Sequence, residues 1–315
     1  MPKEITHWRV AKQAYHCLAA CPLKQLISRH LQLYLAGAVV FDSPAYVKWG
    51  AARGKAAAIV NGLHDTAADT YAPILQLLQE EPPAGSPLWA FIAGLLSHVV
   101  TDAVFHPFVF YFAGTGVSSA AMVRHHLLET LLDNLVMAKH PLAGQGRFAN
   151  LRPSLGTAER LDWLRRFYLS QALVTNAFVK LCLRRHAFFQ RLYFSRIAMN
   201  ALRLVHSLSG CLESFPPLFY PAMKPAPRAY NRLFAYRHPV SGEALADSPA
   251  TLEQRAVERC RVLYHLFGEP ADGGRRLIDH AGLGPNLNTG MPNTRRHDMR
   301  YSNTRAHIGD MFCRP

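Results

Sequence analysis

The chain has 315 residues, half of them hydrophobic, and 35 Lys and Arg against 21 Asp and Glu give a formal net charge of +14. Such a chain is long enough to bury a sizeable core, and its composition excludes a disordered protein and argues against one built from many membrane spans. The positive charge favours phosphates, nucleic acid or an anionic membrane as partners, unless it serves solubility alone.

The first two predicted elements are helices. Thr6 suits the N-cap of a helix, and the apolar spacing behind it predicts that this helix runs to about Pro22. A second helix is predicted from Leu23 to Leu35, ended by Gly37. The N-terminal residues lack the apolar run and the cleavage site of a signal peptide. We therefore expect a cytoplasmic protein, and peripheral contact with the inner membrane stays open.

The remaining elements are also predicted to be helices. Helical patterns, separated by Pro and Gly clusters, occur at about 52 to 61, 66 to 80, 87 to 105, 119 to 139, 157 to 185, 187 to 211 and 251 to 267. No run alternates for long like a strand, so the predicted fold class is all-α, a many-helix bundle. We expect one helical domain over residues 1–268. A polar, basic tail over residues 269–315 is either poorly ordered or an arm lying over the site.

The apolar stretch from Leu88 to Phe112 is long enough to resemble a transmembrane helix. It contains His98, Asp102 and His106, and ionisable groups at such depth usually mark a functional site rather than a lipid-facing surface. We therefore predict no transmembrane segment. The stretch is predicted to be a buried helix of a soluble protein, broken near its end by Pro107.

The three ionisable residues of this stretch are predicted to share one face of the helix. His98, Asp102 and His106 lie four residues apart, and each such step turns a helix by only about 40°. A single His would more often be a satisfied core residue. Three such side chains in register on an apolar helix favour a metal site.

Further candidate ligands lie on either side of this helix. His125 and Glu129 stand one turn apart on the next predicted helix, as two ligands from a single helix must, although an exposed i, i+4 pair has the same spacing. His7 lies in the first helix, Asp42 in a Pro-containing loop, and His64 at or near a helix start. Each of these three is weak evidence alone.

In chain order the eight residues read His, Asp, His, HxxxD, His and HxxxE. This order resembles that of the zinc-dependent phospholipase C family and, more distantly, of the single-strand-specific nucleases that share its fold. The closest local matches are Thr6-His7-Trp8, the HxxxD helix with its following His106-Pro107, and the segment from His125 to Thr130. The resemblance covers about the first 135 residues and implies a helical bundle with two to three Zn²⁺ ions held between helices.

The resemblance also implies a role for each candidate residue. Asp42 would act as a general base or orient the attacking water. Asp65 and Asp69 would form hydrogen bonds that orient the metal-binding side chains. The third ion would also use the N-terminal residue, which is Pro2 if Met1 is removed. The implied ligand sets are Asp42, His64, His98 and Asp102 for the first ion, His106, His125 and Glu129 for the second, and His7 with a shared Asp102 for the third.

The implied activity is hydrolysis of a phosphodiester to a phosphomonoester and an alcohol, with a phospholipid as the preferred substrate. The alternatives are a nuclease or a small-molecule phosphodiesterase that uses the same metals, and a helical scaffold in which zinc serves stability alone. Five aromatic residues could contact either a lipid or a nucleic-acid base: Tyr34, Tyr46, Trp49, Tyr111 and Phe112.

Overall fold

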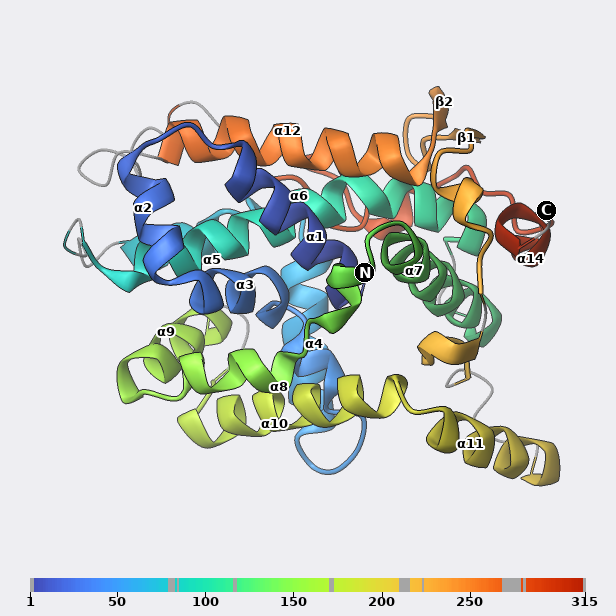
Figure 1. Cartoon of the computed structure of the whole chain (residues 1–315), viewed down its shortest axis with the longest axis horizontal. Coiled ribbons are helices and arrows are strands. Elements are labelled where there is room, and N and C mark those ends of the chain that lie inside the picture. The colour runs from blue at the N-terminus through green and yellow to red at the C-terminus, as the bar shows by residue number, and fades with distance from the viewer. Residues whose placement is uncertain are drawn as a thin grey trace.

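Helices make up nearly all of the regular structure in a computed structural model of the chain (Figure 1). The structure describes residues 3–78, 83, 85–115, 118–169, 173–209, 216–222, 224–267, 279 and 282–313. The α-helices are α1 (Glu4–Cys17), α2 (Pro22–Arg29), α3 (Leu31–Val40), α4 (Arg53–His64), α5 (Ala72–Leu75), α6 (Pro87–Ala113), α7 (Ser119–Lys139), α8 (Phe148–Leu151), α9 (Ala158–Leu169), α10 (Asn176–Tyr193), α11 (Arg196–Ser209), α12 (Pro249–Phe267) and α14 (Ile308–Cys313).

Short 3-10 turns and one hairpin complete the described elements. Strands β1 (Phe234–Arg237) and β2 (Ala244–Asp247) pair antiparallel, with Phe234 opposite Asp247. The all-α prediction is therefore confirmed. The turns are η1 (Ser43–Tyr46), η2 (Gln76–Leu78), η3 (Pro141–Gln145), η4 (Arg152–Leu155), η5 (Pro216–Leu218), η6 (Tyr220–Ala222), η7 (Pro227–Tyr230) and η8 (Arg296–Asp298).

Helix α6 forms the centre of the bundle, and α1, α3, α7 and α12 pack around it (Figure 1). All its residues except Pro87 and Tyr111 are buried. Among the described residues α6 is the one helix long and apolar enough to cross a membrane, and the window that meets this test is entirely buried inside the protein. The prediction of a buried core helix is confirmed.

Helix α6 is longer than its sequence pattern indicates. The pattern predicts an end near residue 105, yet the helix continues through Pro107 to Ala113, where Gly114 caps it with φ +97°. Proline has no N–H to donate to the carbonyl four residues earlier, which normally breaks or kinks a helix. Here the apolar side chains on both sides of Pro107 are buried, and their packing outweighs the lost hydrogen bond.

Helices α3 and α6 approach each other through two glycines. The predicted helix from Leu23 to Leu35 is in fact two helices, α2 and α3, and Gly37 lies inside α3 instead of ending it. A Cβ atom on Gly94 would overlap the backbone oxygen of Tyr34 and lie 2.9 Å from the Cα of Gly37. Gly37 is therefore needed for close packing, which overrides its low helix propensity.

This contact makes a testable prediction about stability. Gly94→Ala is expected to lower the free energy of unfolding by about 1–3 kcal/mol, because the clashing atoms belong to the backbone and cannot rotate away. Gly54→Ala is the matched control, since nothing lies within 4 Å of its added Cβ, and it should stabilise α4 by up to about 1 kcal/mol. Denaturant unfolding measures both values, and equal effects of the two substitutions would contradict the close-packing interpretation.

The C-terminal residues 282–313 lie against the helices that surround the candidate site. The backbone N–H of Arg296 donates to Asp65 just after α4, and that of Gly284 donates to Asp69. The carbonyl of Leu287 reaches His106 in the middle of α6. This segment is thus an arm on the helical body, while the predicted domain boundary at residue 268 lies outside the described residues and stays a prediction.

Candidate metal centre

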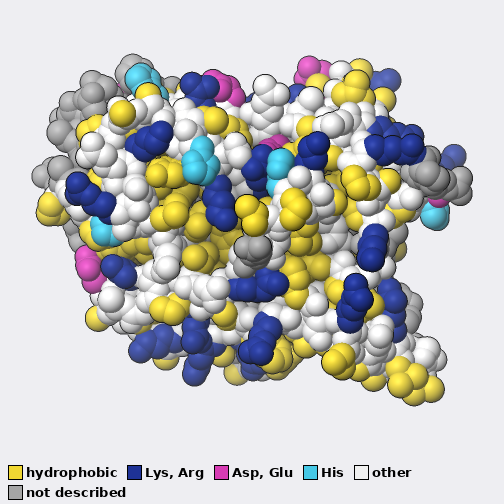
Figure 2. Space-filling model, viewed as in Figure 1, with side chains coloured by type: hydrophobic (Ala, Val, Ile, Leu, Met, Phe, Trp, Pro, Cys, Tyr) yellow, Lys and Arg dark blue, Asp and Glu magenta, His cyan; other side chains and the backbone are white. Residues whose placement is uncertain are grey.

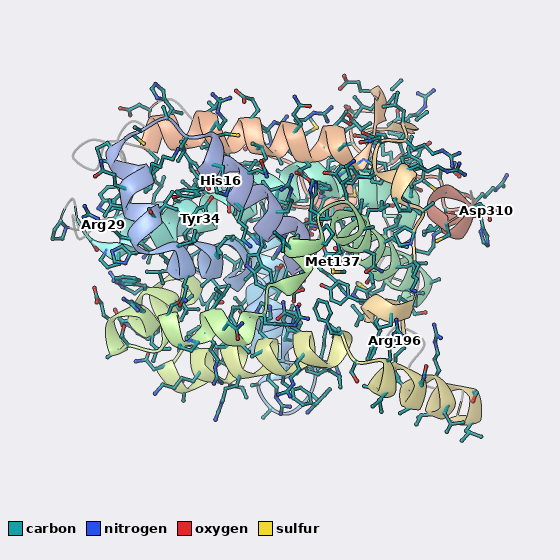
Figure 3. The ribbon with its side chains drawn as sticks, viewed as in Figure 1. His16, Arg29, Tyr34, Met137, Arg196 and Asp310 are labelled. Atoms are coloured by element: carbon teal, nitrogen blue, oxygen red, sulfur yellow. The ribbon has the colours of Figure 1, made fainter. Side chains whose placement is uncertain are left out.

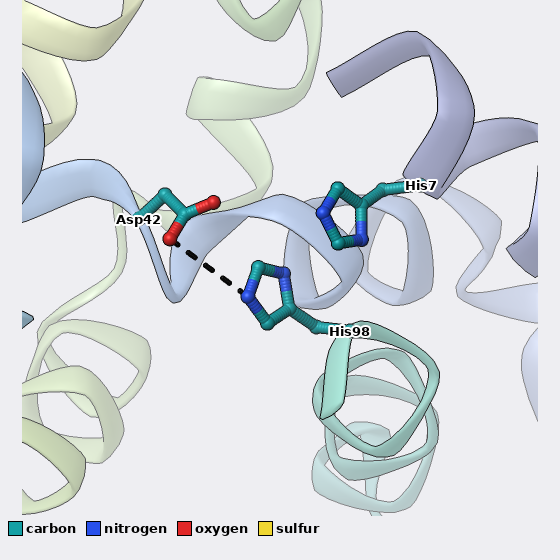
Figure 4. Close-up of side chains that lie close together, drawn as sticks. All are labelled: His7, Asp42 and His98. Carbon is teal, nitrogen blue, oxygen red and sulfur yellow. Dashed lines mark ion pairs between the residues drawn. The ribbon is translucent and has the colours of Figure 1, made fainter. Parts of the chain in front are cut away.

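The eight candidate ligands converge from five parts of the chain. Helix α6 contributes three of them, α7 two, α1 one, the loop after α3 one, and α4 one. His64 is the last residue of α4, so its predicted position near a helix start is wrong. Figure 4 shows how His7, Asp42 and His98 approach one another from α1, the loop and α6.

A buried carboxylate of α7 positions the first of these elements. Lys3, the N-cap of α1, makes no side-chain capping hydrogen bond. Instead, Asp133 accepts hydrogen bonds from the backbone N–H groups of Ile5 at 3.1 Å and Thr6 at 2.8 Å. Because these amides would otherwise be unsatisfied, Asp133 fixes the start of α1, and therefore His7, beside α7.

The first group of candidate ligands has the dimensions of a tetrahedral zinc site. His64 Nε2 lies 3.1 Å from Asp42 Oδ1 and 3.5 Å from Asp102 Oδ2, while His98 Nε2 lies 3.8 Å and 3.2 Å from the same two atoms. Ligands about 2.0–2.2 Å from a tetrahedral zinc ion are separated by roughly 3.3–3.6 Å. The four atoms therefore surround a space of the right size for one ion.

Asp102 links this group to the other candidate ligands through its second oxygen. Asp102 Oδ1 lies 3.3 Å from His7 Nε2 and 3.8 Å from His106 Nε2. On the α7 side, Glu129 Oε1 lies 2.8 Å from His125 Nε2 and 3.9 Å from His106 Nε2. His106, His125 and Glu129 form a second group whose ligand atoms lie within 4.8 Å of one another. One carboxylate thus stands between two or more potential ion positions.

Several polar atoms of the cluster lack hydrogen bonds, which supports the fit of a metal. Both oxygens of Asp102, both ring nitrogens of His7, and Nε2 of His98 are buried without a hydrogen-bond partner. Burying a polar group unsatisfied costs several kcal/mol, and native proteins rarely leave so many together. An atom set of this kind is suited to coordinate cations.

Backbone carbonyls orient three of the histidines. The Nδ1 atoms of His64, His98 and His106 lie 2.8 Å, 3.0 Å and 2.5 Å from the carbonyl oxygens of Val60, Ala38 and Leu287, respectively. Each Nδ1 then carries the proton, and the lone pair of Nε2 faces the cluster, as in typical metal-binding histidines.

Asp65 and Asp69 do not occupy the supporting positions expected for them. Their carboxylates accept hydrogen bonds from backbone amides, Asp65 from Arg296 and Asp69 from Tyr71 and Gly284. The expectation was wrong because the Nδ1 atoms of the histidines are instead in contact with carbonyl oxygens of the helix backbone and of the C-terminal arm. Such a partner cannot be recognised from the sequence, because every residue has a backbone carbonyl.

The electrostatics of the cluster also suit a cation. Burial lowers the pKa of His106 to about 3 and that of His125 well below its usual value, so both rings are neutral, as zinc ligands must be. Burial also opposes a proton on His64, but its contacts with Asp102 and Asp42 outweigh burial and raise its pKa to about 9. Without a metal, a second proton on His64 therefore partly offsets the negative charge of these two carboxylates.

A narrow cavity of about 60 Å³ opens beside the cluster. His7, Asp42 and Glu129 of the cluster line it, together with Lys3, Lys48 and Tyr46. In the first group, the Asp42 side chain is 11% exposed, compared with 5% for His64 and 0% for His98 and Asp102. Asp42 is thus the carboxylate of this group that solvent or a substrate reaches.

A second buried network, which the sequence did not reveal, adjoins the cavity. His186 Nε2 lies 3.2 Å from Glu4 Oε1, and its Nδ1 lies 2.8 Å from the hydroxyl of Ser43, the neighbour of Asp42. Glu4 also accepts hydrogen bonds from the hydroxyls of Tyr46 and Tyr220. Burial opposes the charge on Glu4, but the hydrogen bonds from His186 and Tyr46 hold its pKa at about 2. This network joins α1 to the loop that carries Asp42.

The five aromatic residues singled out as possible substrate contacts are spread through the structure. Tyr34, which is labelled in Figure 3, is fully buried. Its hydroxyl donates to the carbonyl of Ala11, and Phe112 is buried in α6. Trp49 is half exposed. Of the five, Tyr46 is the one that lines the cavity.

Comparison with known protein families is consistent with this arrangement. Residues 6–185, which are 180 of the 315, match the family model described as zinc dependent phospholipase C, and this segment contains all eight candidate ligands. No curated protein and no solved structure shows significant similarity to the chain. Because the match covers more than half of its length, the chain belongs to the zinc-dependent phospholipase C family.

Proposed function

We propose that the protein is a phospholipase C that hydrolyses the phosphodiester bond of a phospholipid between the glycerol and the phosphate. Family membership supports a phospholipase C-like hydrolase. The observation that carries the proposal furthest is the bridging carboxylate of Asp102, with candidate ligands on both of its oxygens, next to a cavity that Asp42 lines.

The proposed metal ligands are those that the structure brings together. Asp42, His64, His98 and Asp102 would hold one ion, and His106, His125 and Glu129 another. His7 and Asp102 would contribute to a third, whose remaining ligand falls on residues 1 and 2, outside the described part of the chain. Zinc bound there would act as a Lewis acid: it would neutralise negative charge on the phosphoryl oxygens and lower the pKa of a bound water.

The side chains around the cavity suit this reaction. Asp42 combines partial exposure with a position at the edge of the first group, so its carboxylate is placed to accept a proton from an attacking water. Lys48 lines the same cavity and brings a positive charge toward a phosphate there.

A substrate panel tests the proposal. Purified, zinc-loaded protein is expected to release diacylglycerol from phospholipid, to lose this activity in a chelator and to regain it when Zn²⁺ is added back. Single-stranded DNA and an artificial phosphodiester serve as competing substrates. Cleavage of DNA without lipid hydrolysis would favour a nuclease, and inactivity on all three substrates at full zinc content would favour a structural role for the metal.

A further inference from the structure

Helix α11 projects away from the body of the protein beyond the end of α10 (Figure 1). Met199 is its buried contact, and Ala198 and Leu202 pack partly against the core. Four large apolar side chains of α11 are exposed to solvent: Ile197 is 84% exposed, Leu204 60%, Val205 47% and Leu208 80%. Single exposed apolar side chains are common, but four on one projecting helix indicate a binding partner.

Three of the exposed apolar side chains of α11 form a single stripe. Leu204 and Leu208 follow Ile197 by seven and eleven residues, and at about 100° per residue both point within about 20° of its direction. Arg196 and Arg203 each precede a member of the stripe by one residue and so lie along its flank. An apolar stripe bordered by arginine is typical of helices that lie in a membrane interface.

The charge of this region is uniformly positive. Residues 176–209, which contain α10 and α11, include no Asp or Glu, and their six basic residues are Lys180, Arg184, Arg185, Arg191, Arg196 and Arg203. Figure 2 shows hydrophobic side chains at the projecting corner and Lys and Arg along the adjoining edge, and Figure 3 marks Arg196 where α11 begins. Such a surface complements anionic lipid.

We propose that α11 docks on the surface of an anionic phospholipid membrane, with Ile197, Leu204 and Leu208 inserted among the lipids and Arg196 and Arg203 at the headgroups. A second copy of the chain fits this face less well. Two such surfaces would bring together like charges, and residues 176–209 offer no acid to pair with them.

The position of α11 relates this surface to the proposed active site. Tyr193 lines the cavity and precedes α11 by three residues, and Leu218 of η5, which packs on α11, lines it too. Docking would bring this side of the cavity close to the lipid. The purpose of docking rests on the proposed phospholipase function, but the docking itself is measured without catalysis.

The test compares binding to vesicles by sedimentation, using zinc-loaded Asp42→Asn protein so that the lipid stays intact. Leu204→Glu combined with Leu208→Glu is expected to lower the partition coefficient on phosphatidylglycerol–phosphatidylcholine vesicles at least about tenfold. Leu142→Glu with Leu233→Glu is the matched control, because these leucines are 74% and 63% exposed elsewhere and the charge changes equally. The control should stay within about twofold of the parent protein.

A second pair of substitutions probes the charge. Arg196→Gln with Arg203→Gln leaves the apolar stripe intact, so it should weaken binding to anionic vesicles and flatten its dependence on salt. Circular dichroism and zinc content verify that each variant is folded.

Three results would overturn the proposal: equal losses in the α11 and control variants, equal binding to vesicles of phosphatidylcholine alone, or a dimer that the α11 substitutions convert to a monomer. A dissolved short-chain phospholipid separates docking from catalysis. Leu204→Glu with Leu208→Glu in the otherwise wild-type chain should hydrolyse it at the normal rate. If no variant hydrolyses it, the phospholipase function fails while the vesicle result still stands.

Discussion

Replacing Asp102 by Asn is expected to lower the bound zinc by at least one ion per chain, leaving at most the group of His106, His125 and Glu129 occupied. Asp102 has no exposed surface, and its two oxygens face different groups of candidate ligands. The substitution removes the charge and one of the oxygens, so every group that uses Asp102 loses a ligand. Elemental analysis after dialysis against trace Zn²⁺ measures the result, and activity should fall with the metal.

Asp69→Asn is the control for this experiment. It removes the same charge from a carboxylate that accepts hydrogen bonds from the backbone of Tyr71 and Gly284, so zinc content should not change. Full zinc content in Asp102→Asn would contradict the bridging role. Less than one zinc ion in the unmodified protein after loading would contradict the metal centre as a whole.

Replacing Asp42 by Asn is expected to lower the rate of phospholipid hydrolysis by at least about a hundredfold, the usual contribution of a general base. His64, His98 and Asp102 remain around the first site, and the amide side chain has nearly the shape of the carboxylate that it replaces. Most of the zinc and the helical structure should therefore be retained. Initial rates of diacylglycerol release, measured together with zinc content, test this expectation.

Asp65→Asn serves as the control for Asp42, because Asp65 is another carboxylate near the centre but accepts a hydrogen bond from the backbone of Arg296. It should hydrolyse phospholipid at close to the normal rate. Near-normal turnover by Asp42→Asn would remove Asp42 from a catalytic role. If zinc and activity disappear together, Asp42 acts as a ligand and the assignment of the base falls.

The parts of the centre that lie on single helices could be predicted from spacing. His98, Asp102 and His106 recur every four residues, and the structure places them on one buried face of α6. The same holds for His125 and Glu129 on α7. Such patterns are visible because the helix itself brings the residues together, whatever the rest of the fold does.

The contributions of His7, Asp42 and His64 could be proposed only through the family resemblance, because they meet α6 through the tertiary fold. The network of Glu4, His186 and Ser43 was missed for the same reason: Glu4 and His186 are 182 residues apart. No local pattern encodes a contact over that distance. Helix ends at Gly37 and Pro107 were also misjudged, since packing against neighbouring helices overrode local preference.

The hydrogen bond between His106 and the carbonyl of Leu287 has a consequence for the order in which the protein is built. The two residues are 181 positions apart, and all eight candidate ligands precede Leu287 by more than 150 residues. A ribosome therefore adds every candidate metal ligand long before it adds the carbonyl group that orients His106. The nascent chain can form the first group of ligands early, but His106 gains this partner only when synthesis is nearly complete.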